Sequence, residues 1–239
     1  MDCNLSLSDF CDNFYSSTGK ENSPGQIIYC PVSFHDRTPL IADITRADGI
    51  EHKKADITIR KYKETVDFKG KNRLPVAALA NLGDREEAII SIGKVRPCLL
   101  IGKVGEVNPN LLPEGWQRNK ALNAFDSQYV MAPIYSVASV YEPGAFGPII
   151  TARIRAAMYP EFLFLPQSDP ALPNNSICRL DRMFLSPLLC ATRHRDLWLH
   201  ADAMNFLNEH LFWMLGKDPE EEFMETRQLL LDDLPDEAK

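Results

Sequence analysis

The stretch Lys94-Val95-Arg96-Pro97-Cys98-Leu99-Leu100-Ile101 runs from basic residues through an Arg-Pro step into an apolar segment. Pro97 has a fixed φ and no backbone N–H, and it keeps the preceding residue out of the helical region. The apolar segment, which is bounded by Gly102, is typical of a short buried strand. We therefore expect Arg96 at the entrance of a strand, where its rigid fork of donors can face a phosphate or a carboxylate.

The composition is that of an ordinary folded protein: of 239 residues, 45% are hydrophobic and 25% are charged. The net charge of -7 excludes a surface coated with basic residues, although a local basic cleft is compatible with it because acidic residues concentrate near the C-terminus. No apolar run approaches the roughly 18 residues of a membrane span, and the acidic N-terminus lacks the basic head of a secretory signal. We therefore expect a cytoplasmic protein that does not enter a membrane.

The cysteines and histidines point to neither a disulfide framework nor a metal site. The 6 cysteines include no CxxC pair, and the 5 histidines have no metal-ligand spacing. No glycine-rich phosphate loop or comparable motif occurs either, so we expect no metal and no cofactor.

The hydrophobic pattern predicts many short strands. Residues 1–24 are polar and rich in Ser and Asn, which predicts a loosely held arm. Apolar runs and alternating segments predict strands at residues 25–32, 56–62, 88–92, 95–101, 129–134, 161–165 and 176–180. The short Gly93-Lys94 link predicts a hairpin between the strands on either side of it.

Helices are predicted mainly near the C-terminus. Pro148 is expected to start an inner helix, and Pro219 a final acidic helix. Asp196 is expected to cap a helix over residues 197–215, with Arg193-His194-Arg195 placed before its N-terminus, where they could hold an anion. This order predicts a mainly β protein with helices, of the α+β class, built on a small β-barrel or a strongly bent sheet.

Five segments resemble, in the right order, those of MazF/PemK-type toxins, a family of messenger-RNA-cleaving proteins. They are Gly25-Gln26-Ile27-Ile28-Tyr29, Arg96-Pro97-Cys98-Leu99-Leu100-Ile101, Ala132-Pro133-Ile134-Tyr135-Ser136, the segment from Leu172 to Met183, and Met214-Leu215-Gly216. The resemblance implies an SH3-like barrel over residues 25–216, interrupted by an insertion at 33–92 and followed by an acidic helix at 217–239. It also implies a homodimer, an antitoxin partner, and sequence-specific, metal-independent cleavage of single-stranded RNA.

The resemblance and the chemistry of RNA cleavage indicate the candidate catalytic residues. Cleavage through the 2′-hydroxyl needs a base and a cation that stabilises charge on the phosphate, and Arg96 suits the second task. The family's catalytic threonine falls on Tyr135, which can hydrogen-bond a phosphate or stack on an unpaired base. Ser136 carries a hydroxyl one position along, although adjacent strand residues face opposite sides. We predict these three residues as catalytic.

Basic residues are the candidates for RNA binding, namely Lys94, Lys61, Arg60, Arg153 and Arg179. Arg60 and Lys61 belong to a basic stretch that includes Tyr62, and this pattern also suits a solvated strand edge that prevents aggregation. Arg179 can alternatively form an ion pair with Asp181.

The sequence leaves more than one function open. The first is a MazF-like endoribonuclease. The second is a catalytically silent SH3-like module that binds nucleic acid or a protein, a hypothesis favoured by Tyr135 at the threonine position, by the acidic balance and by the insertion. A third hypothesis is that the acidic C-terminal helix mimics nucleic acid and covers a basic surface of the barrel.

Overall fold

The computed structural model describes residues 5–34, 38–46, 50, 54–70, 85–104, 128–137, 146–187 and 193–239. The chain divides into two compact units, the first made of Met1–Pro31 with Val95–Lys239 and the second of Val32–Lys94. The predicted insertion at residues 33–92 falls inside the second unit.

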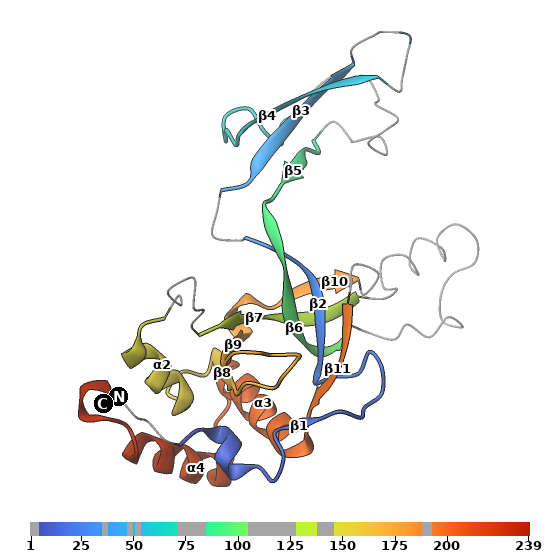
Figure 1. The fold of residues 1–239 in the computed structure, drawn as a ribbon. Helices are drawn as coiled ribbons and strands as arrows, with labels where there is room; N and C mark the ends of the chain where they lie inside the picture. Colours follow the sequence, from blue (N-terminus) through green and yellow to red (C-terminus); the bar gives the residue numbers. More distant parts are fainter. Residues whose placement is uncertain are drawn as a thin grey trace. The chain divides into compact units, whose positions relative to one another are not determined.

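The first unit is built on a curled sheet with helices packed against it (Figure 1). Its strands are β1 (Tyr15–Ser16), β2 (Gln26–Ser33), β6 (Gly93–Lys103), β7 (Gln128–Ser136), β8 (Phe162–Leu165), β9 (Ser176–Arg179), β10 (Phe184–Pro187) and β11 (Arg193–Leu199). Its α-helices are α2 (Pro148–Arg155), α3 (Ala201–Met214) and α4 (Glu221–Asp232), and short 3-10 turns form η1 (Leu7–Phe10), η4 (Leu180–Arg182) and η6 (Asp236–Ala238). None of the helices in the described ranges combines the length and apolarity needed to cross a bilayer.

The sheet has the strand order β1-β11-β2-β6-β7-β9-β8, with β10 also paired to β7. Its strands are mostly antiparallel, and they curl into a half-barrel. The predicted α+β class is therefore confirmed.

The strand that carries Arg96 is longer than predicted. β6 begins at Gly93, so Arg96 lies inside the strand and not at its entrance. The φ of Pro97 is compatible with extended backbone, and its missing N–H removes one hydrogen bond without ending the strand. The predicted hairpin across Gly93-Lys94 is also wrong, because β5 (Ala88–Ile90) pairs with β3 (Leu40–Arg46) and not with β6.

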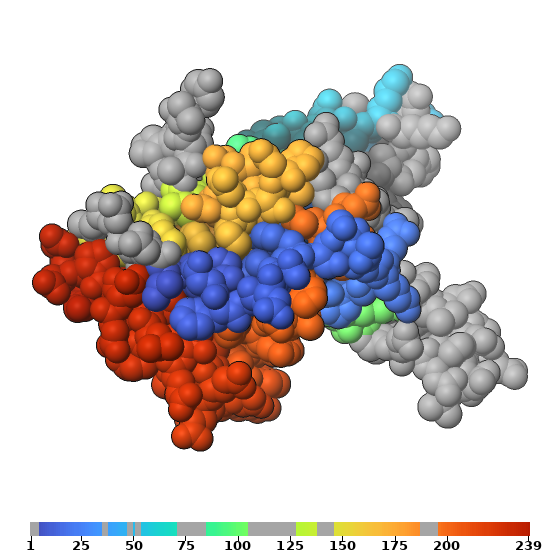
Figure 2. Space-filling view, turned by 60° about the horizontal axis from the view of Figure 1, so that its bottom comes forward, coloured from blue at the N-terminus to red at the C-terminus, as the bar shows by residue number. Residues whose placement is uncertain are grey.

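The described part of the N-terminal segment packs against the main unit, which corrects the predicted loose arm. Leu7 and Phe14 are buried in the core, and Tyr15 donates a hydrogen bond of 2.8 Å from its hydroxyl to the Pro166 carbonyl. The backbone N–H of Leu5 donates to Asp233 Oδ2 at 3.0 Å. The segment (blue) therefore lies between the C-terminal helices (red) and the segment around β8 and β9 (yellow to orange) in Figure 2.

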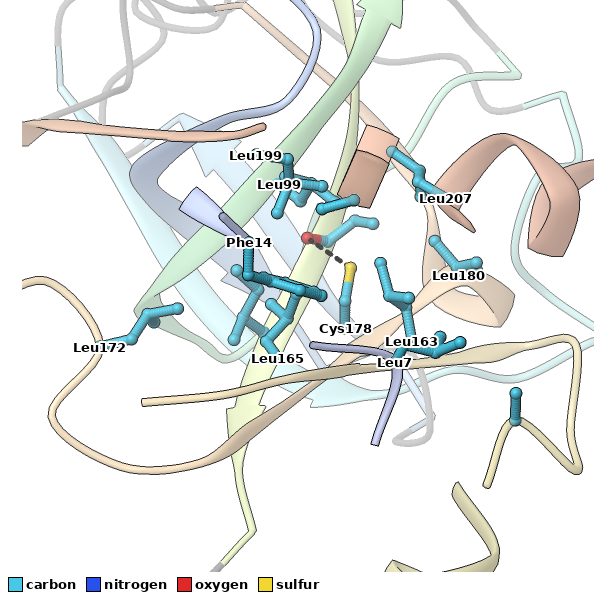
Figure 3. Close-up of a cluster of buried hydrophobic side chains, with 14 of the residues drawn as sticks. Leu7, Phe14, Leu99, Leu163, Leu165, Leu172, Cys178, Leu180, Leu199 and Leu207 are labelled. Carbon is cyan, nitrogen blue, oxygen red and sulfur yellow. Dashed lines mark hydrogen bonds between the residues drawn. The ribbon is translucent and has the colours of Figure 1, made fainter. Parts of the chain in front are cut away.

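The core lies on one face of the curled sheet, under α3 and the N-terminal segment (Figure 3). Strand pairing brings its residues together, since Leu163 and Ile134 both lie opposite Cys178, a fully buried thiol. The Cys178 thiol lies 3.9 Å from the Ala132 carbonyl oxygen. Alternation along each strand therefore leaves the residues between these positions on the opposite face.

The helix predicted from Asp196 begins later than expected. Residues 193–199 form β11, which pairs with both β1 and β2, and α3 begins at Ala201. The run Leu197-Trp198-Leu199 is buried throughout, and a short apolar run of this kind does not distinguish a central strand from a helix. Arg193-His194-Arg195 thus lie in a strand and not before a helix N-terminus.

The C-terminal end of α3 follows the predicted signal, whereas α4 begins at Glu221, two residues after the proline that was expected to start it. Gly216, at φ +77°, donates its N–H to the Trp213 carbonyl, and Lys217 donates to Phe212, which is a Schellman motif. The acidic helix α4 buries Phe223 and Leu230 in the core of the first unit, so one of its faces is structural.

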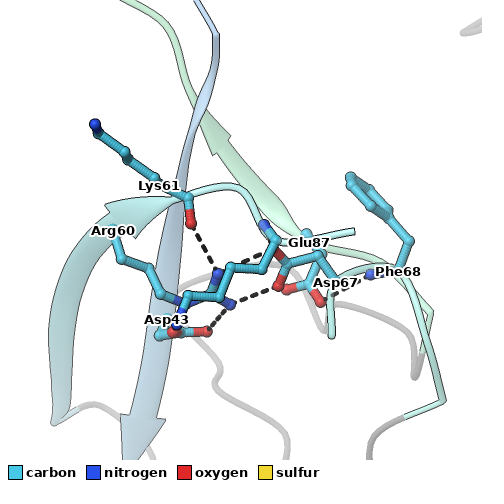
Figure 4. A network of polar contacts seen from close by, with 7 residues as sticks. Asp43, Arg60, Lys61, Asp67, Phe68 and Glu87 are labelled. Atoms are coloured by element: carbon cyan, nitrogen blue, oxygen red, sulfur yellow. Dashed lines mark hydrogen bonds and ion pairs between the residues drawn. The ribbon is translucent and has the colours of Figure 1, made fainter. Parts of the chain in front are cut away.

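The second unit contains a three-stranded antiparallel sheet in the order β4-β3-β5, where β4 spans Ala55–Lys61. Arg60 of β4 links the strands of this sheet through a network of hydrogen bonds (Figure 4). Its guanidinium donates to Asp43 of β3, and it donates to both carboxylate oxygens of Asp67 at 2.5 and 2.9 Å. Asp67 also accepts the Lys63 N–H at 2.6 Å, and its side chain is fully buried. These hydrogen bonds, first to Asp67 and then to Asp43, raise the pKa of Arg60.

Candidate nucleic-acid interface

Arg96 and Tyr135 lie in direct contact on neighbouring strands. β6 and β7 are paired with Cys98 opposite Pro133, and the same register carried two residues further places Arg96 opposite Tyr135. The Arg96 guanidinium carbon lies 4.4 Å from the centre of the Tyr135 ring. Both residues are half-buried, so the guanidinium rests on the ring as a cation–π pair that is partly shielded from water.

A second arginine, Arg179, lies on the next strand, β9. Tyr135 pairs with Ile177 of β9, and Arg179 lies two residues further on the same face. Its guanidinium carbon is 4.8 Å from the Phe162 ring centre and 5.8 Å from that of Phe146.

The positive charge of Arg179 is paired with the carboxylate of Asp181. Its Nε donates to Asp181 Oδ1 at 2.6 Å, and a second guanidinium nitrogen donates to Oδ2. This pairing is the main reason that the pKa of Arg179 is raised.

A third arginine, Arg155 of α2, also lies over an aromatic ring. Phe164 of β8 lies opposite Ile177, and the Arg155 guanidinium carbon is 5.2 Å from the Phe164 ring centre. The Arg155 Nε is buried and has no hydrogen-bond partner within the described part of the chain. We call this set the arginine–aromatic face, and its members are Arg96, Tyr135, Arg179, Phe162, Phe164 and Arg155. Phe164 is buried with Ile154 and Ile177, so the partly exposed rings of the set are those of Tyr135 and Phe162.

The arginine–aromatic face combines two kinds of chemistry. Guanidinium groups donate fixed hydrogen bonds to phosphate oxygens, and their planes also stack on bases. Aromatic rings offer a second stacking surface, which every unpaired base can use. Asp181 neutralises one of the three arginines, so the net positive charge of the face is modest.

Ser136 does not join the other two predicted catalytic residues. It is the last residue of β7 and lies opposite Ser176, so its side chain points to the other side of the sheet from Tyr135. The hydroxyl expected to stand in for the family's threonine is therefore turned away from Arg96.

The predicted RNA-binding residues are dispersed. Of these, Arg179 belongs to the arginine–aromatic face. Arg153 instead donates to the carbonyl oxygens of Ala238 at 2.8 Å and Lys239 at 3.1 Å, which holds η6 against α2. Arg60 is held by its two aspartates (Figure 4), and Lys61 and Lys94 are exposed residues of the second unit.

The prediction missed Arg155. It lies in the last turn of α2, where a basic residue is common because it complements the helix dipole. Its aromatic partner Phe164 follows on another element, so local sequence gave no signal of the contact.

Within the described ranges, no group of three or more His, Cys, Asp or Glu side chains is arranged to hold a metal ion. Comparisons of the chain with protein-family models and with curated proteins gave no match.

Proposed function

We propose that the arginine–aromatic face binds single-stranded RNA. The observation that carries the proposal is the cation–π pair of Arg96 and Tyr135, with Arg179 on the next strand, two residues beyond the Ile177 that pairs with Tyr135. Such a surface suits unpaired nucleotides, because a single strand offers both a phosphate and an exposed base, whereas a duplex hides its base faces.

The charge of the face predicts how binding depends on salt. Asp181 pairs with Arg179, and we assign the phosphate contacts of the proposed complex to Arg96 and Arg155. Two phosphate contacts to a single strand correspond to a slope of log K against log salt of about -1.4. A protein that binds RNA through a broad basic surface gives a much steeper slope.

We further propose that the half-barrel is an SH3-like barrel of the MazF/PemK type. Four of the five resembling segments lie on β2, β6, β7 and β9, which are consecutive neighbours in the sheet. This order supports a shared architecture, and with it a homodimer and an antitoxin partner as further proposals.

Cleavage of the bound RNA is the second candidate function, favoured by the contact of a cation with a hydroxyl-bearing side chain. In this reaction the 2′-hydroxyl loses its proton to solvent water and its oxygen bonds to phosphorus, the bond from phosphorus to the 5′-oxygen breaks, and the 5′-oxygen takes up a proton from water. Arg96 would stabilise charge on the phosphate, and the Tyr135 phenol would donate to one of the phosphate oxygens.

Binding is tested by fluorescence anisotropy with short single-stranded RNA at several salt concentrations. We expect Tyr135→Leu to weaken binding about 5- to 150-fold, which corresponds to the roughly 1–3 kcal/mol of stacking on one base. Tyr135→Phe keeps the ring and should bind like the parent protein. Lys61→Ala, an exposed charge on the second unit, is the control and should change little. Absence of binding at low salt, or equal weakening by Tyr135→Leu and Lys61→Ala, contradicts the proposal.

Cleavage is tested separately by incubating the same RNA with the protein in the presence of a chelator. If the phenol acts in the reaction, Tyr135→Phe abolishes product formation while binding persists, and a 2′-deoxy substitution at the cleaved position makes the RNA resistant. If the protein binds the RNA but forms no cleavage product, it is a catalytically silent module that binds nucleic acid.

A further inference from the structure

Two cysteine thiols lie in contact inside the sheet of the first unit. Cys30 is on β2 and Cys98 is on β6, and these two strands are neighbours in the sheet (Figure 1). Their sulfur atoms are only 3.3 Å apart, and both residues are buried, with 1% and 0% of their surface exposed. The two positions are separated by 68 residues in the sequence, so no CxxC spacing indicates the pair.

The contact is specific to this pair. Among the four cysteines that the structure describes, all of them free thiols, only Cys30 and Cys98 lie sulfur to sulfur. By the register of β6, β7 and β9, the side chain of Cys178 points to the opposite side of the sheet from that of Cys98. The Cys11 sulfur lies in the N-terminal segment, 3.5 Å from the Leu7 carbonyl oxygen.

The geometry of the pair is close to that of a disulfide. A disulfide holds its sulfurs about 2.05 Å apart, so each sulfur of the pair needs to move only about 0.6 Å. A small rotation about χ1 in each side chain moves the sulfur by this distance. Little hydrogen bonding is lost in the process, because a thiol is a weak donor and the Cys98 sulfur is 3.7 Å from the Arg96 carbonyl oxygen.

The contact also makes one sulfur the better nucleophile. The thiolate is the form of cysteine that attacks an oxidant. When Cys30 is deprotonated, the Cys98 thiol can donate a hydrogen bond to it, which lowers the pKa of Cys30, while burial opposes the shift. The same hydrogen bond and then burial raise the pKa of Cys98. Cys30 is therefore suited to react first, and Cys98 to react with the product.

The position of the pair in the chain gives a bond between the two sulfurs a structural consequence. The second unit spans Val32–Lys94, so Cys30 comes two residues before it and Cys98 four residues after it. A bond between them encloses the whole second unit in one covalent loop. Closing a loop of this length restricts the unfolded chain and thereby stabilises the folded one.

We propose that Cys30 and Cys98 are a redox pair, which a hydroperoxide oxidises to a disulfide that closes the loop around the second unit. The Cys30 thiolate bonds to one peroxide oxygen, the O–O bond breaks, and the released hydroxide takes up a proton to form water. The Cys98 sulfur then bonds to the Cys30 sulfur, the S–O bond breaks, and the hydroxyl leaves with the Cys98 proton as a second water. The two sulfurs together lose the two electrons that reduce the peroxide, and a small dithiol reverses the bond by exchange.

Burial decides which oxidants react. Oxidised glutathione is too bulky to approach sulfurs that are at most 1% exposed. Hydrogen peroxide is close to water in size and reaches them during brief local openings of the strand pair. Once Cys30 is oxidised, Cys98 already lies beside it, so the S–S bond forms before a second peroxide arrives. This inference does not depend on the function proposed for the arginine–aromatic face.

Treatment of the folded full chain with hydrogen peroxide tests the proposal. After the remaining thiols are blocked and the protein is digested with trypsin, mass spectrometry should find residues 21–37 linked to residues 95–103, because trypsin does not cut between Arg96 and Pro97. A dithiol should separate the two peptides. Cys30→Ser should abolish the linked product. Cys178→Ser, which removes a buried thiol without a sulfur contact, is the matched control and should form the product like the parent protein.

A second measurement compares the oxidised and reduced parent protein in urea and needs no variant. The unfolding equilibrium constant of the oxidised form should be about 30- to 1,000-fold smaller, the range typical of a native disulfide. Equal or lower stability of the oxidised form would overturn the proposal, because it would show that the folded sheet does not accommodate the bond. A linked product that forms only after unfolding in urea would also overturn it, as would equal yields of Cys30 linked to Cys11 or Cys178.

Discussion

His210 should make the stability of the protein depend on pH in the mildly acidic range. The side chain is fully buried in α3, with Nδ1 3.1 Å from the Pro160 carbonyl oxygen and its ring edge-on to Phe223 at 5.5 Å. Since a carbonyl only accepts, Nδ1 carries the proton of the neutral ring. Burial is the main reason that the pKa of His210 is lowered to about 4; the nearby Arg227 lowers it further, and the hydrogen bond to Pro160 opposes the shift.

The sign and size of the effect follow from linkage. In the unfolded chain the histidine takes up a proton below its ordinary pKa of about 6.5, whereas in the folded protein it stays neutral until about pH 4. Protonation therefore favours the unfolded state between these values, and the free energy of unfolding falls as the pH is lowered. From pH 7.5 to pH 5 the loss attributable to His210 is about 2 kcal/mol, and it approaches about 3 kcal/mol by pH 4.

Urea unfolding at pH 7.5 and pH 5 measures this loss in the parent protein and in His210→Asn, whose amide can keep a donor near the Pro160 carbonyl but does not titrate. The variant should lose about 2 kcal/mol less than the parent between the two pH values, because carboxylates titrate equally in both and cancel. Leu207→Ala, a cavity variant on the same helix, controls for general destabilisation and should keep the pH dependence of the parent. Equal pH dependence in the parent and His210→Asn would refute the reasoning, as would a His210 ring that titrates near its ordinary pKa by NMR.

Two further predictions concern β6 and the second unit. Gly93→Ala should lower the free energy of unfolding by about 1–3 kcal/mol, because the added Cβ would lie 2.7 Å from the Val32 carbonyl oxygen. The control is Gly102→Ala on the same strand, whose added Cβ meets nothing within 4 Å, so this variant should be neutral or stabilising. Equal effects of the two variants in urea unfolding would contradict this prediction. In Arg60→Lys, the single ammonium cannot bridge both Asp43 and Asp67, so hydrogen exchange of backbone amides should become faster in β3 and β4 but not in β7 or β9. Lys61→Gln, at the exposed neighbouring residue, is the control and should leave exchange in both regions unchanged. Unchanged exchange in Arg60→Lys would show that the network does not stabilise this sheet.

The local hydrophobic pattern of the sequence predicted the positions of most strands, but not which strands pair with one another. Each of the seven predicted strands overlaps an observed one, because alternation and short apolar runs are properties of the strand itself. β11 was missed because its apolar run continues into the pattern of α3, and only pairing with β1 and β2 decides that it is extended. The predicted hairpin failed for the same reason, since β5 finds its partner β3 more than forty residues earlier in the chain.

The candidate site was predictable only in part. The Arg-Pro step singled out Arg96 and the family resemblance singled out Tyr135, but their contact depends on the register between β6 and β7, which no local signal fixes. Arg60 has the same residue type as Arg96 and a different role, because Asp43 and Asp67 converge on it after folding. A basic side chain becomes a ligand-binding group or a structural one according to which carboxylates the fold brings to it.

The two proposed functions, binding and cleavage of RNA, differ in what they require of the side chain at position 135. In the family that the chain resembles, this position carries a hydroxyl close to the backbone; here the hydroxyl lies at the far end of a ring, and Arg96 stacks on that ring. Ser136 cannot restore the short hydroxyl, because adjacent residues of β7 face opposite sides of the sheet. Compared with a threonine, a tyrosine at this position adds a ring on which a base can stack and moves the hydroxyl away from the backbone, and this favours our proposal that the protein binds an unpaired strand.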